Sequence, residues 1–387
     1  MSLSQATTTV LLTLLALIPI GAAFAVVVAW SGLYSVAASS GHYGFVERFL
    51  AFGMRSSVET QSLFINPPQD FGSDDQVALG AGHFEGGCAP CHGAPGRRAN
   101  PIVQQMLPAP PQLGPRIAGW RDRELFWIVK HGIKYAGMPA WVGRGRDDEA
   151  WAVAAFLARL PQLSAQDYLR LARGNVEMPR QPPDELIRSG PQGTSIAASA
   201  RCHGDGDAAP VSALVPRLAG QKERYLLEAL RAYATAERPS GIMQPVVAEL
   251  SEPQLSELAR FYSELTPRPP PNAEMEADAL TSEGRVLARE GKQVSGLPAC
   301  LSCHQPDTTG VYPLIAGQPA AYIASQLRLF RKGARSATAS GAIMTAIARR
   351  LGDRDIQAVA AWLARQPQSI GLRRPGEQAV GAEGSAQ

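Results

Sequence analysis

Two short cysteine motifs and one incomplete copy carry most of the chemistry that this sequence offers. Cys88-Ala-Pro-Cys91-His92 and Cys300-Leu-Ser-Cys303-His304 share one pattern, in which a histidine directly follows the second of two spaced cysteines. The pair Cys202-His203 resembles them, but Ser199 stands where the first cysteine would be. The chain has 5 cysteines in all, and an odd number argues against a disulfide framework. The thiols must therefore serve another purpose.

Cys-x-x-Cys-His is the attachment signature of c-type haem. The two thiols add to the porphyrin vinyl groups, and the adjacent histidine becomes an axial ligand of the iron. A methionine sulfur on the opposite side raises the reduction potential relative to two imidazoles. When protein groups fill both axial positions, no site is left for oxygen or substrate, and the iron is suited to electron transfer.

One methionine follows each Cys-His site inside the same order of loop and helix. The interval from histidine to methionine is 40 residues at the second site, 40 at the third and 46 at the first. A chance Cys-His pair would not share this frame, so the middle site is interpreted as a true repeat. The predicted axial pairs are His92 with Met138, His203 with Met243, and His304 with Met344.

The predicted thioether residues are Cys88, Cys91, Cys202, Cys300 and Cys303. Because serine cannot form a thioether, we predict that the middle of three haems is attached through Cys202 alone. The alternative is a middle domain that has lost its haem. A Cys-x-x-Cys pair supplies two of the four ligands of a zinc site, and the other two would have to follow at the usual spacing. A thioredoxin-like redox pair would need a βαβ context. Neither context is found in the sequence.

A carbonyl group from the proline-containing loop should accept the ring N–H of each ligand histidine. Pro216 and Pro313 are the candidates in the second and third repeats, whereas Pro111 and Pro115 are both candidates in the first. His131, seven residues before Met138, could compete for iron, but we assign it to the surface.

The elements that must position these residues are predicted to be helices. Apolar residues recur at helical spacing between loops rich in the 37 glycines and 31 prolines, which indicates an all-α chain. A net charge of +3 provides no large basic field for nucleic acid. Linkers rich in proline and charge separate the repeats. The predicted domains span 76–172, 183–267 and 277–368, followed by a flexible tail at 369–387.

The N-terminus contains an uncharged apolar run from Val10 to Trp30, long enough for a helix that spans a membrane. We predict an uncleaved anchor at 1–35. The alternative is a cleaved signal peptide, but the segment before the run has no basic residue. The segment 36–75 contains an amphipathic helix, which could lie on the membrane surface, pack on a partner subunit or cover the first domain.

Each repeat also has a proline-containing loop that ends in Ala-Gly, at 118–119, 219–220 and 316–317, and a closing helix that bears an aromatic residue. Together with Cys-x-x-Cys-His and the distal methionine, these features resemble class I cytochromes c in three tandem copies. The first copy and its anchor also resemble, more loosely, the membrane-anchored cytochrome subunit of periplasmic molybdenum hydroxylases, which include aldehyde dehydrogenases and isoquinoline-oxidoreductase-like enzymes. The class I resemblance implies a haem-wrapping bundle in each domain, attached outside the cytoplasm. The chain would then cross the bacterial inner membrane once, with its haem domains in the periplasm.

These features predict an electron-transfer subunit that is not catalytic alone. It would pass electrons from a periplasmic dehydrogenase with an iron-sulfur subunit to quinone or a terminal oxidase. The resemblance to the molybdenum-hydroxylase subunit implies that this dehydrogenase oxidises aldehydes with molybdenum. The alternatives are the cytochrome subunit of a quinoprotein alcohol or sugar dehydrogenase, and a cytochrome subunit or donor of a haem-copper oxidase. A peroxidase is a further alternative and would need one iron with a displaceable ligand.

Overall fold

The computed structural model describes residues 3–174, 194–206, 208–270 and 278–370 of the 387-residue chain. Within these ranges the chain is mostly helical, with no strand and only isolated bridges. The all-α prediction is therefore confirmed. The α-helices are α1 (Leu3–Ser31), α2 (Gly44–Gln61), α3 (Asp74–His83), α4 (Ala89–His92), α5 (Leu113–Ile117), α6 (Asp122–His131), α7 (Asp147–Arg159), α8 (Ala165–Arg173), α10 (Thr194–His203), α11 (Glu223–Ala234), α12 (Met243–Ala248), α13 (Glu252–Glu264), α14 (Ala279–Arg289), α15 (Ala320–Arg331), α16 (Ala339–Ala348) and α17 (Asp353–Leu363).

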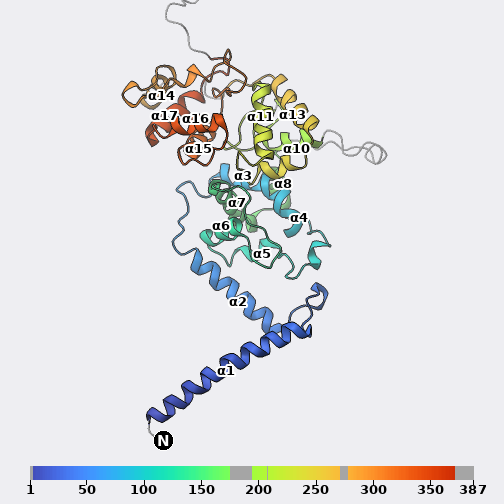
Figure 1. Ribbon diagram of the computed structural model, residues 1–387. Coiled ribbons are helices and arrows are strands. Elements are labelled where there is room, and N and C mark those ends of the chain that lie inside the picture. Colours follow the sequence, from blue (N-terminus) through green and yellow to red (C-terminus); the bar gives the residue numbers. More distant parts are fainter. Residues whose placement is uncertain (1–2, 175–193, 207, 271–277, 371–387) are drawn as a thin grey trace, which may run out of the picture.

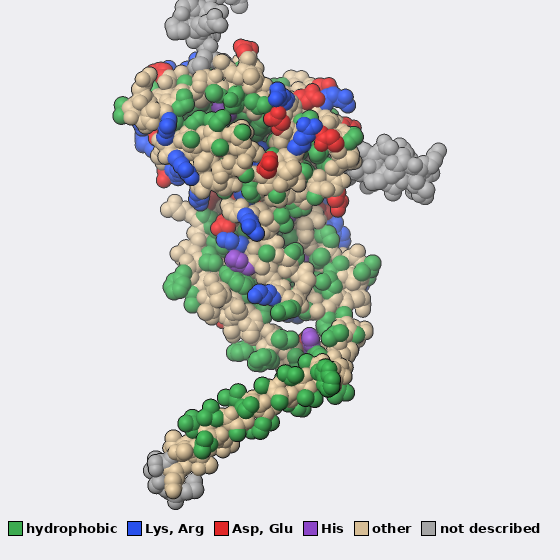
Figure 2. Space-filling model, in the orientation of Figure 1, with side chains coloured by type: hydrophobic (Ala, Val, Ile, Leu, Met, Phe, Trp, Pro, Cys, Tyr) green, Lys and Arg blue, Asp and Glu red, His purple; other side chains and the backbone are tan. Residues whose placement is uncertain are grey.

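The N-terminal helix α1 extends away from the rest of the molecule (Figure 1). Residues Thr7–Ser31 have a mean hydropathy of 2.7, which makes this helix long and apolar enough to cross a membrane. Hydrophobic side chains cover its visible surface (Figure 2). Helix α2 links it to the remainder and packs on α6, where Arg55 donates to the Gly119 carbonyl oxygen at 2.7 Å.

Buried apolar residues beyond α2 form three separate cores. We call the surrounding elements the first bundle (α3–α8), the second bundle (α10–α13) and the third bundle (α14–α17). The second and third bundles lie side by side, and the first bundle lies between them and α2 (Figure 1). The linkers expected around 173–185 and 266–278, and the tail expected at 369–387, fall largely outside the described residues.

In the first and third bundles, the opening and closing helices cross in close contact. Helix α3 packs on α7 and helix α14 packs on α17. At the crossings, a Cβ atom on Gly80 or Gly284 would collide with the backbone carbonyl of Ala152 or Ala358. Glycine is needed at both positions because only a bare backbone allows this approach. In the second bundle, α11 and α10 pack against the closing helix α13.

A buried carboxylate holds helix α8 against the turn that leads to Cys88. Glu85 accepts hydrogen bonds from Arg97 at 2.8 and 2.9 Å and from Arg173 at 2.7 Å, and it also accepts one from the Tyr168 hydroxyl. Burial alone would raise the pKa of Glu85, but these hydrogen bonds outweigh burial and lower the pKa to about 2. The carboxylate therefore acts as a charged anchor for two segments of the first bundle.

Candidate functional site

The three predicted ligand histidines share one arrangement. Nδ1 lies at hydrogen-bond distance from a proline carbonyl oxygen, with separations of 2.9 Å for His92 and Pro111, 3.0 Å for His203 and Pro216, and 2.9 Å for His304 and Pro313. Because a carbonyl oxygen can only accept, Nδ1 carries a proton, and in the neutral ring Nε2 then keeps its lone pair. Each ring is thereby held in the tautomer and orientation of a metal ligand.

These contacts confirm the predicted roles of Pro216 and Pro313 and distinguish between the two prolines of the first repeat. Pro115 lies inside the short helix α5, whereas Pro111 precedes that helix in the loop. The loop carbonyl of Pro111 is free to turn toward His92 and accepts a hydrogen bond from its Nδ1–H group. The sequence could not show where the helix begins.

Of the ligand histidines of the second and third bundles, His304 is buried and His203 is half-buried. Burial lowers the pKa of His203 and of His304, while the hydrogen bond to the proline carbonyl opposes the shift in each case. A lowered pKa keeps the imidazole neutral near neutral pH, and only the neutral ring can bind a metal through Nε2. Both side chains are therefore prepared as ligands.

A cavity of 1910 Å³ lies where the second and third bundles meet, and residues of the first bundle, among them Gly82, His83 and Glu149, also line it. Its volume is about twice the upper end of the range of about 300–1,000 Å³ that is typical of small-molecule pockets. The predicted haem-site residues that line it are Ser199, Cys202, His203, Met243, Cys300, Cys303, His304 and Met344. The structure therefore brings two of the three predicted ligand sets to the walls of one apolar cavity.

The remaining predicted ligand set, which belongs to the first repeat, lies in the first bundle. His92 and Met138 are half-buried, and the Met138 carbonyl oxygen accepts a hydrogen bond from the Ile133 amide at 3.2 Å. A Cβ atom on Gly137 would collide with the Met106 methyl group, so Met106 packs beneath the loop that carries Met138. His131 is exposed, in agreement with its assignment to the surface.

All five cysteines are free thiols. Burial raises the pKa of Cys88 to about 12 and that of Cys300 to about 11, so these thiols stay protonated at neutral pH. Within the described part of the chain, no group of three or more His, Cys, Asp or Glu side chains is placed to hold a metal ion.

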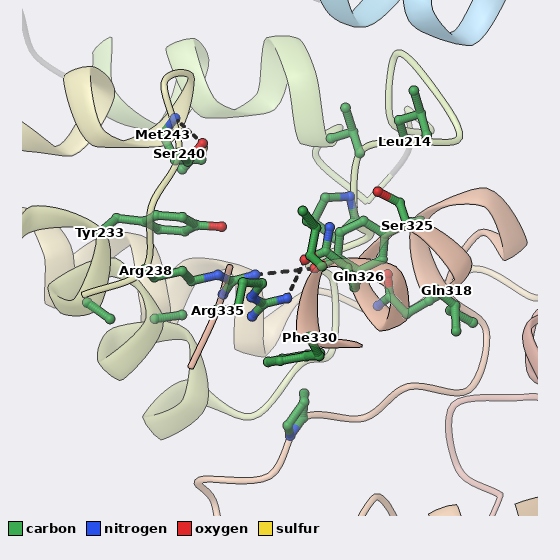
Figure 3. A pocket seen from close by; sticks show the side chains of 18 of the residues that line it. Leu214, Tyr233, Arg238, Ser240, Met243, Gln318, Ser325, Gln326, Phe330 and Arg335 are labelled. Carbon is green, nitrogen blue, oxygen red and sulfur yellow. Dashed lines mark hydrogen bonds between the residues drawn. The ribbon is translucent and has the colours of Figure 1, made fainter. Parts of the chain in front are cut away.

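Two half-buried arginines that line the cavity test whether it fits a haem. Arg238 and Arg335 lie close together beside Tyr233 and Gln326 (Figure 3). Neither guanidinium has a carboxylate partner among the described residues, and Nε of Arg335 is buried without a hydrogen bond. Burial and the neighbouring Arg238 lower the pKa of Arg335. Two half-buried positive charges favour an anion between them, and the propionate groups of a haem would meet this need. The residues present therefore fit the cofactor.

The middle site contains a compensating residue that the sequence analysis missed. The Tyr262 hydroxyl lies 3.0 Å from Ser199 Oγ and 3.2 Å from the Gly204 carbonyl oxygen. Tyr262 is equivalent to Leu363 of the third bundle, because their carbonyl oxygens each accept a hydrogen bond of 2.9 Å from the glycine that ends the Ala-Gly loop. A polar side chain thus accompanies the serine where the third bundle has an apolar one. Comparing the closing helices of the repeats could have revealed it.

Two glutamines join the second and third bundles reciprocally. Gln221 donates to the Leu314 carbonyl oxygen at 2.9 Å and accepts from the Leu314 amide at 2.9 Å. Gln318 makes the same pair of contacts with Arg217, at 2.8 and 3.0 Å. Leu314 and Arg217 directly follow the prolines that bind the ligand histidines. Both glutamines begin the same pattern, Gln221 with Tyr225 and Gln318 with Tyr322 four residues later, which indicates that they are equivalent but does not indicate an interface.

Two segments of the chain match known protein families. Residues 75–157 match the family described as cytochrome C oxidase, cbb3-type, subunit III, and residues 288–366 match the family described as cytochrome c. Both matched segments include a complete Cys-x-x-Cys-His motif.

Two relatives each align with less than half of the chain but with most of their own length. The thiosulfate dehydrogenase electron acceptor of Thiomonas intermedia is 41% identical over 176 residues, which are 45% of this chain and 80% of the relative. Cytochrome c4 of Pseudomonas aeruginosa is 33% identical over 171 residues, 43% of this chain and 83% of the relative. The crystal structure of reduced recombinant cytochrome c4 from Pseudomonas stutzeri matches with a TM-score of 0.39 and 33% identity, covering 44% of this chain and 94% of that one.

Proposed function

Because the chain belongs to the cytochrome c family, we propose that it is a membrane-tethered electron carrier with three covalently attached haems. The proposal divides the chain into cytochrome c domains at 76–172, 183–267 and 277–368, which contain the cores of the three bundles. The observation that carries it is the histidine–proline contact, which recurs at all three Cys-His sites with nearly the same length.

The proposed haem ligands come from equivalent places in each domain. The histidines would provide a nitrogen ligand and the methionines a sulfur ligand, in the pairs His92 with Met138, His203 with Met243 and His304 with Met344. The thioethers form at Cys88 and Cys91, at Cys202 alone, and at Cys300 and Cys303. A bound haem supplies an iron that changes its oxidation state by one electron. The protein would hold the haem through these ligands, and the half-buried Arg238 and Arg335 would balance the charge of its propionates.

This arrangement supports a carrier that is not catalytic alone. Both axial positions are assigned to side chains, so no position is open to a substrate. A peroxidase would need a displaceable ligand, and the singly attached middle haem is where we would look for one. Carbon monoxide binding by the reduced protein tests this alternative, because a protein with complete His/Met ligation binds the gas poorly.

The proposed location is the periplasmic face of the bacterial inner membrane. Helix α1 is the single anchor, with the short N-terminus in the cytoplasm and the haem domains outside. Three aromatic side chains of α2, Phe45, Phe49 and Phe52, are 70–72% exposed and recur at helical spacing. Their position shortly after the anchor supports contact of α2 with the lipid headgroup region.

The proposed electron donor is a periplasmic dehydrogenase, and the acceptor is quinone or a terminal oxidase. Two candidate substrates have separate support. The likeness of the first domain and its anchor to cytochrome subunits of molybdenum hydroxylases favours an aldehyde oxidised by a molybdenum enzyme with an iron-sulfur subunit. The relative from Thiomonas intermedia, described as a thiosulfate dehydrogenase electron acceptor, favours thiosulfate.

Haem counting and purification test the proposal. Pyridine haemochrome analysis of the full chain should give three haems per polypeptide, and a count below three would refute the assignment. Purification from native membranes should bring down the donor. Molybdenum in the complex would support aldehyde oxidation, reduction by thiosulfate would support the second candidate, and copper with a-type or b-type haem would overturn the dehydrogenase assignment.

A further inference from the structure

The first and second bundles meet where the segment after Met138 contacts the segment before Met243. Gly241 lies against the indole ring of Trp141, where a Cβ atom would collide with the ring. Ser240 is only 1% exposed, and Glu149 is only 3% exposed. The two methionine-bearing segments are therefore joined by a closely packed, buried junction, which consists of Trp141, Arg146, Glu149, Ser240 and Gly241.

Glu149 is the centre of this junction, and both of its carboxylate oxygens are used twice. Oε1 accepts from the Ser240 hydroxyl at 2.5 Å and is 2.8 Å from an Arg146 Nη atom. Oε2 accepts from the Gly241 amide at 2.6 Å and from the Trp141 indole N–H at 3.3 Å. Two of these donors belong to the first bundle and two to the second. A buried carboxylate with four donors is fixed in position and fixes its donors in return.

Ser240 transmits this constraint to the predicted sulfur ligand. Its Oγ atom accepts from the Met243 amide at 3.0 Å and from the Ile242 amide at 3.3 Å, and the contact with Met243 is visible in Figure 3. The hydroxyl proton of Ser240 is committed to Glu149, so its lone pairs face the backbone of Met243. Only two hydrogen bonds separate the Met243 backbone from a carboxylate on another bundle.

Arg146 makes the junction independent of an external counter-ion. One of its Nη atoms donates to the Pro239 carbonyl oxygen at 3.0 Å, and the remaining donors bind the Asp148 carboxylate at 2.9 and 3.0 Å. Burial raises the pKa of Glu149, whereas Arg146 and the hydrogen bonds from Ser240 and Gly241 oppose this shift. The first bundle thus presents a paired, pre-organised acceptor to the second bundle.

We propose that Glu149 of the first bundle is a positioning residue for Met243, so that sulfur ligation in the second bundle depends on the docked first bundle. This inference rests on the proposed function, because it assumes a haem whose iron Met243 binds. Met243 lines the cavity shared by the second and third bundles, on whose wall His203 also lies. A displaced Met243 backbone would move the sulfur away from the position that His203 requires of its opposite ligand.

The third bundle provides an internal contrast. There Thr338 caps helix α16 by accepting from the Gly341 amide at 3.0 Å, and Met344 lies within this helix. Among the described residues, no carboxylate from another bundle binds the Thr338 hydroxyl. We therefore expect changes at Glu149 to affect the middle site and to leave the third site unchanged.

The test is Glu149→Gln in the full-length holoprotein. An amide has one acceptor oxygen, so whichever way it turns, its NH₂ group faces donors that the carboxylate had satisfied. We expect the ferric protein to lose the share of sulfur-to-iron charge-transfer absorbance that one of three haems contributes. The reduced variant should bind carbon monoxide at that one haem, and the potential of that haem alone should fall. The matched control is Glu252→Gln, the same change at an exposed helix start in the second bundle.

A second variant keeps the test decisive if Glu149→Gln fails to accumulate. Ser240→Ala removes the hydroxyl between Glu149 and Met243 but leaves the Arg146 ion pair, and we expect the same spectroscopic change. Unchanged charge-transfer absorbance and unchanged potentials in the accumulating variant, with three haems present, would overturn the inference. Wild-type protein with fewer than three haems, or without methionine ligation, would instead overturn the proposed function.

Discussion

Replacement of Gln221 by alanine should weaken the union of the second and third bundles. The side chain crosses from one bundle to the other and satisfies both backbone groups of Leu314 at 2.9 Å. Leu314 is 9% exposed and directly follows Pro313, whose carbonyl oxygen accepts a hydrogen bond from His304 Nδ1. The substitution therefore removes a contact between bundles and a support of the loop that orients a ligand histidine.

The size of the effect follows from the groups left behind. Gln221→Ala leaves the buried N–H and C=O of Leu314 without partners, and each unsatisfied group costs about 1–3 kcal/mol. The sum is about 2–6 kcal/mol if the two costs add. Truncation also opens room for a water molecule between the bundles, which can replace one of the lost bonds. We therefore expect a loss of about 2–4 kcal/mol in the free energy of unfolding.

Denaturant unfolding of the holoprotein, followed by haem absorbance and helical circular dichroism, measures this loss. Gln318→Ala is the matched twin, because Gln318 makes the reciprocal pair of contacts with Arg217. Gln254→Ala is the control, since this glutamine is exposed and acts only within the capping box of α13. If Gln221→Ala and Gln318→Ala lower the free energy of unfolding by no more than the control does, these hydrogen bonds do not hold the bundles together.

Two further predictions concern the middle site and the response to acid. Ser199→Cys should add a second thioether, which mass spectrometry of the haem peptide would detect. The α-band of the reduced protein should shift toward that of haem with two thioethers, and an unmodified thiol at position 199 would contradict this. Glu85 has a folded pKa of about 2 against an ordinary value of 4.5, so its contribution to stability is present above pH 4.5 and is lost as the pH falls toward 2. Glu85→Gln should therefore destabilise the protein at neutral pH, and its difference from wild type in urea unfolding should shrink across that range; a constant difference would count against this account.

The sequence was informative wherever the repeats stay in register. The equal intervals from His203 to Met243 and from His304 to Met344 led to residues that line one cavity. The loop prolines were predicted because a ligand imidazole needs a partner for its other nitrogen. Their carbonyl oxygens lie at 2.9–3.0 Å from the ring nitrogens. Such local rules transfer from one repeat to the next.

The residues that the sequence did not reveal act between repeats or break the register. Arg238 precedes Met243 by 5 residues, whereas Arg335 precedes Met344 by 9, so no comparison of the repeats aligns the two arginines. Glu149 follows two aspartates at the start of α7, where acidic residues commonly stabilise a helix N-terminus. Only tertiary packing shows that this carboxylate is buried against another bundle.

The second bundle is held by its neighbours on both sides of its predicted iron site. On the methionine side, the first bundle fixes Ser240 and Gly241 through Glu149. On the histidine side, the third bundle binds Arg217 through Gln318, next to the proline that orients His203.

A haem attached through one thioether has more freedom to tilt than a haem attached through two, so ligands held rigidly from outside compensate for the missing bond. The Tyr262 hydroxyl contacts the serine that replaces the first cysteine. If the middle haem is attached through Cys202 alone, as proposed, the flanking bundles would offset the missing covalent bond by holding both of its ligand segments.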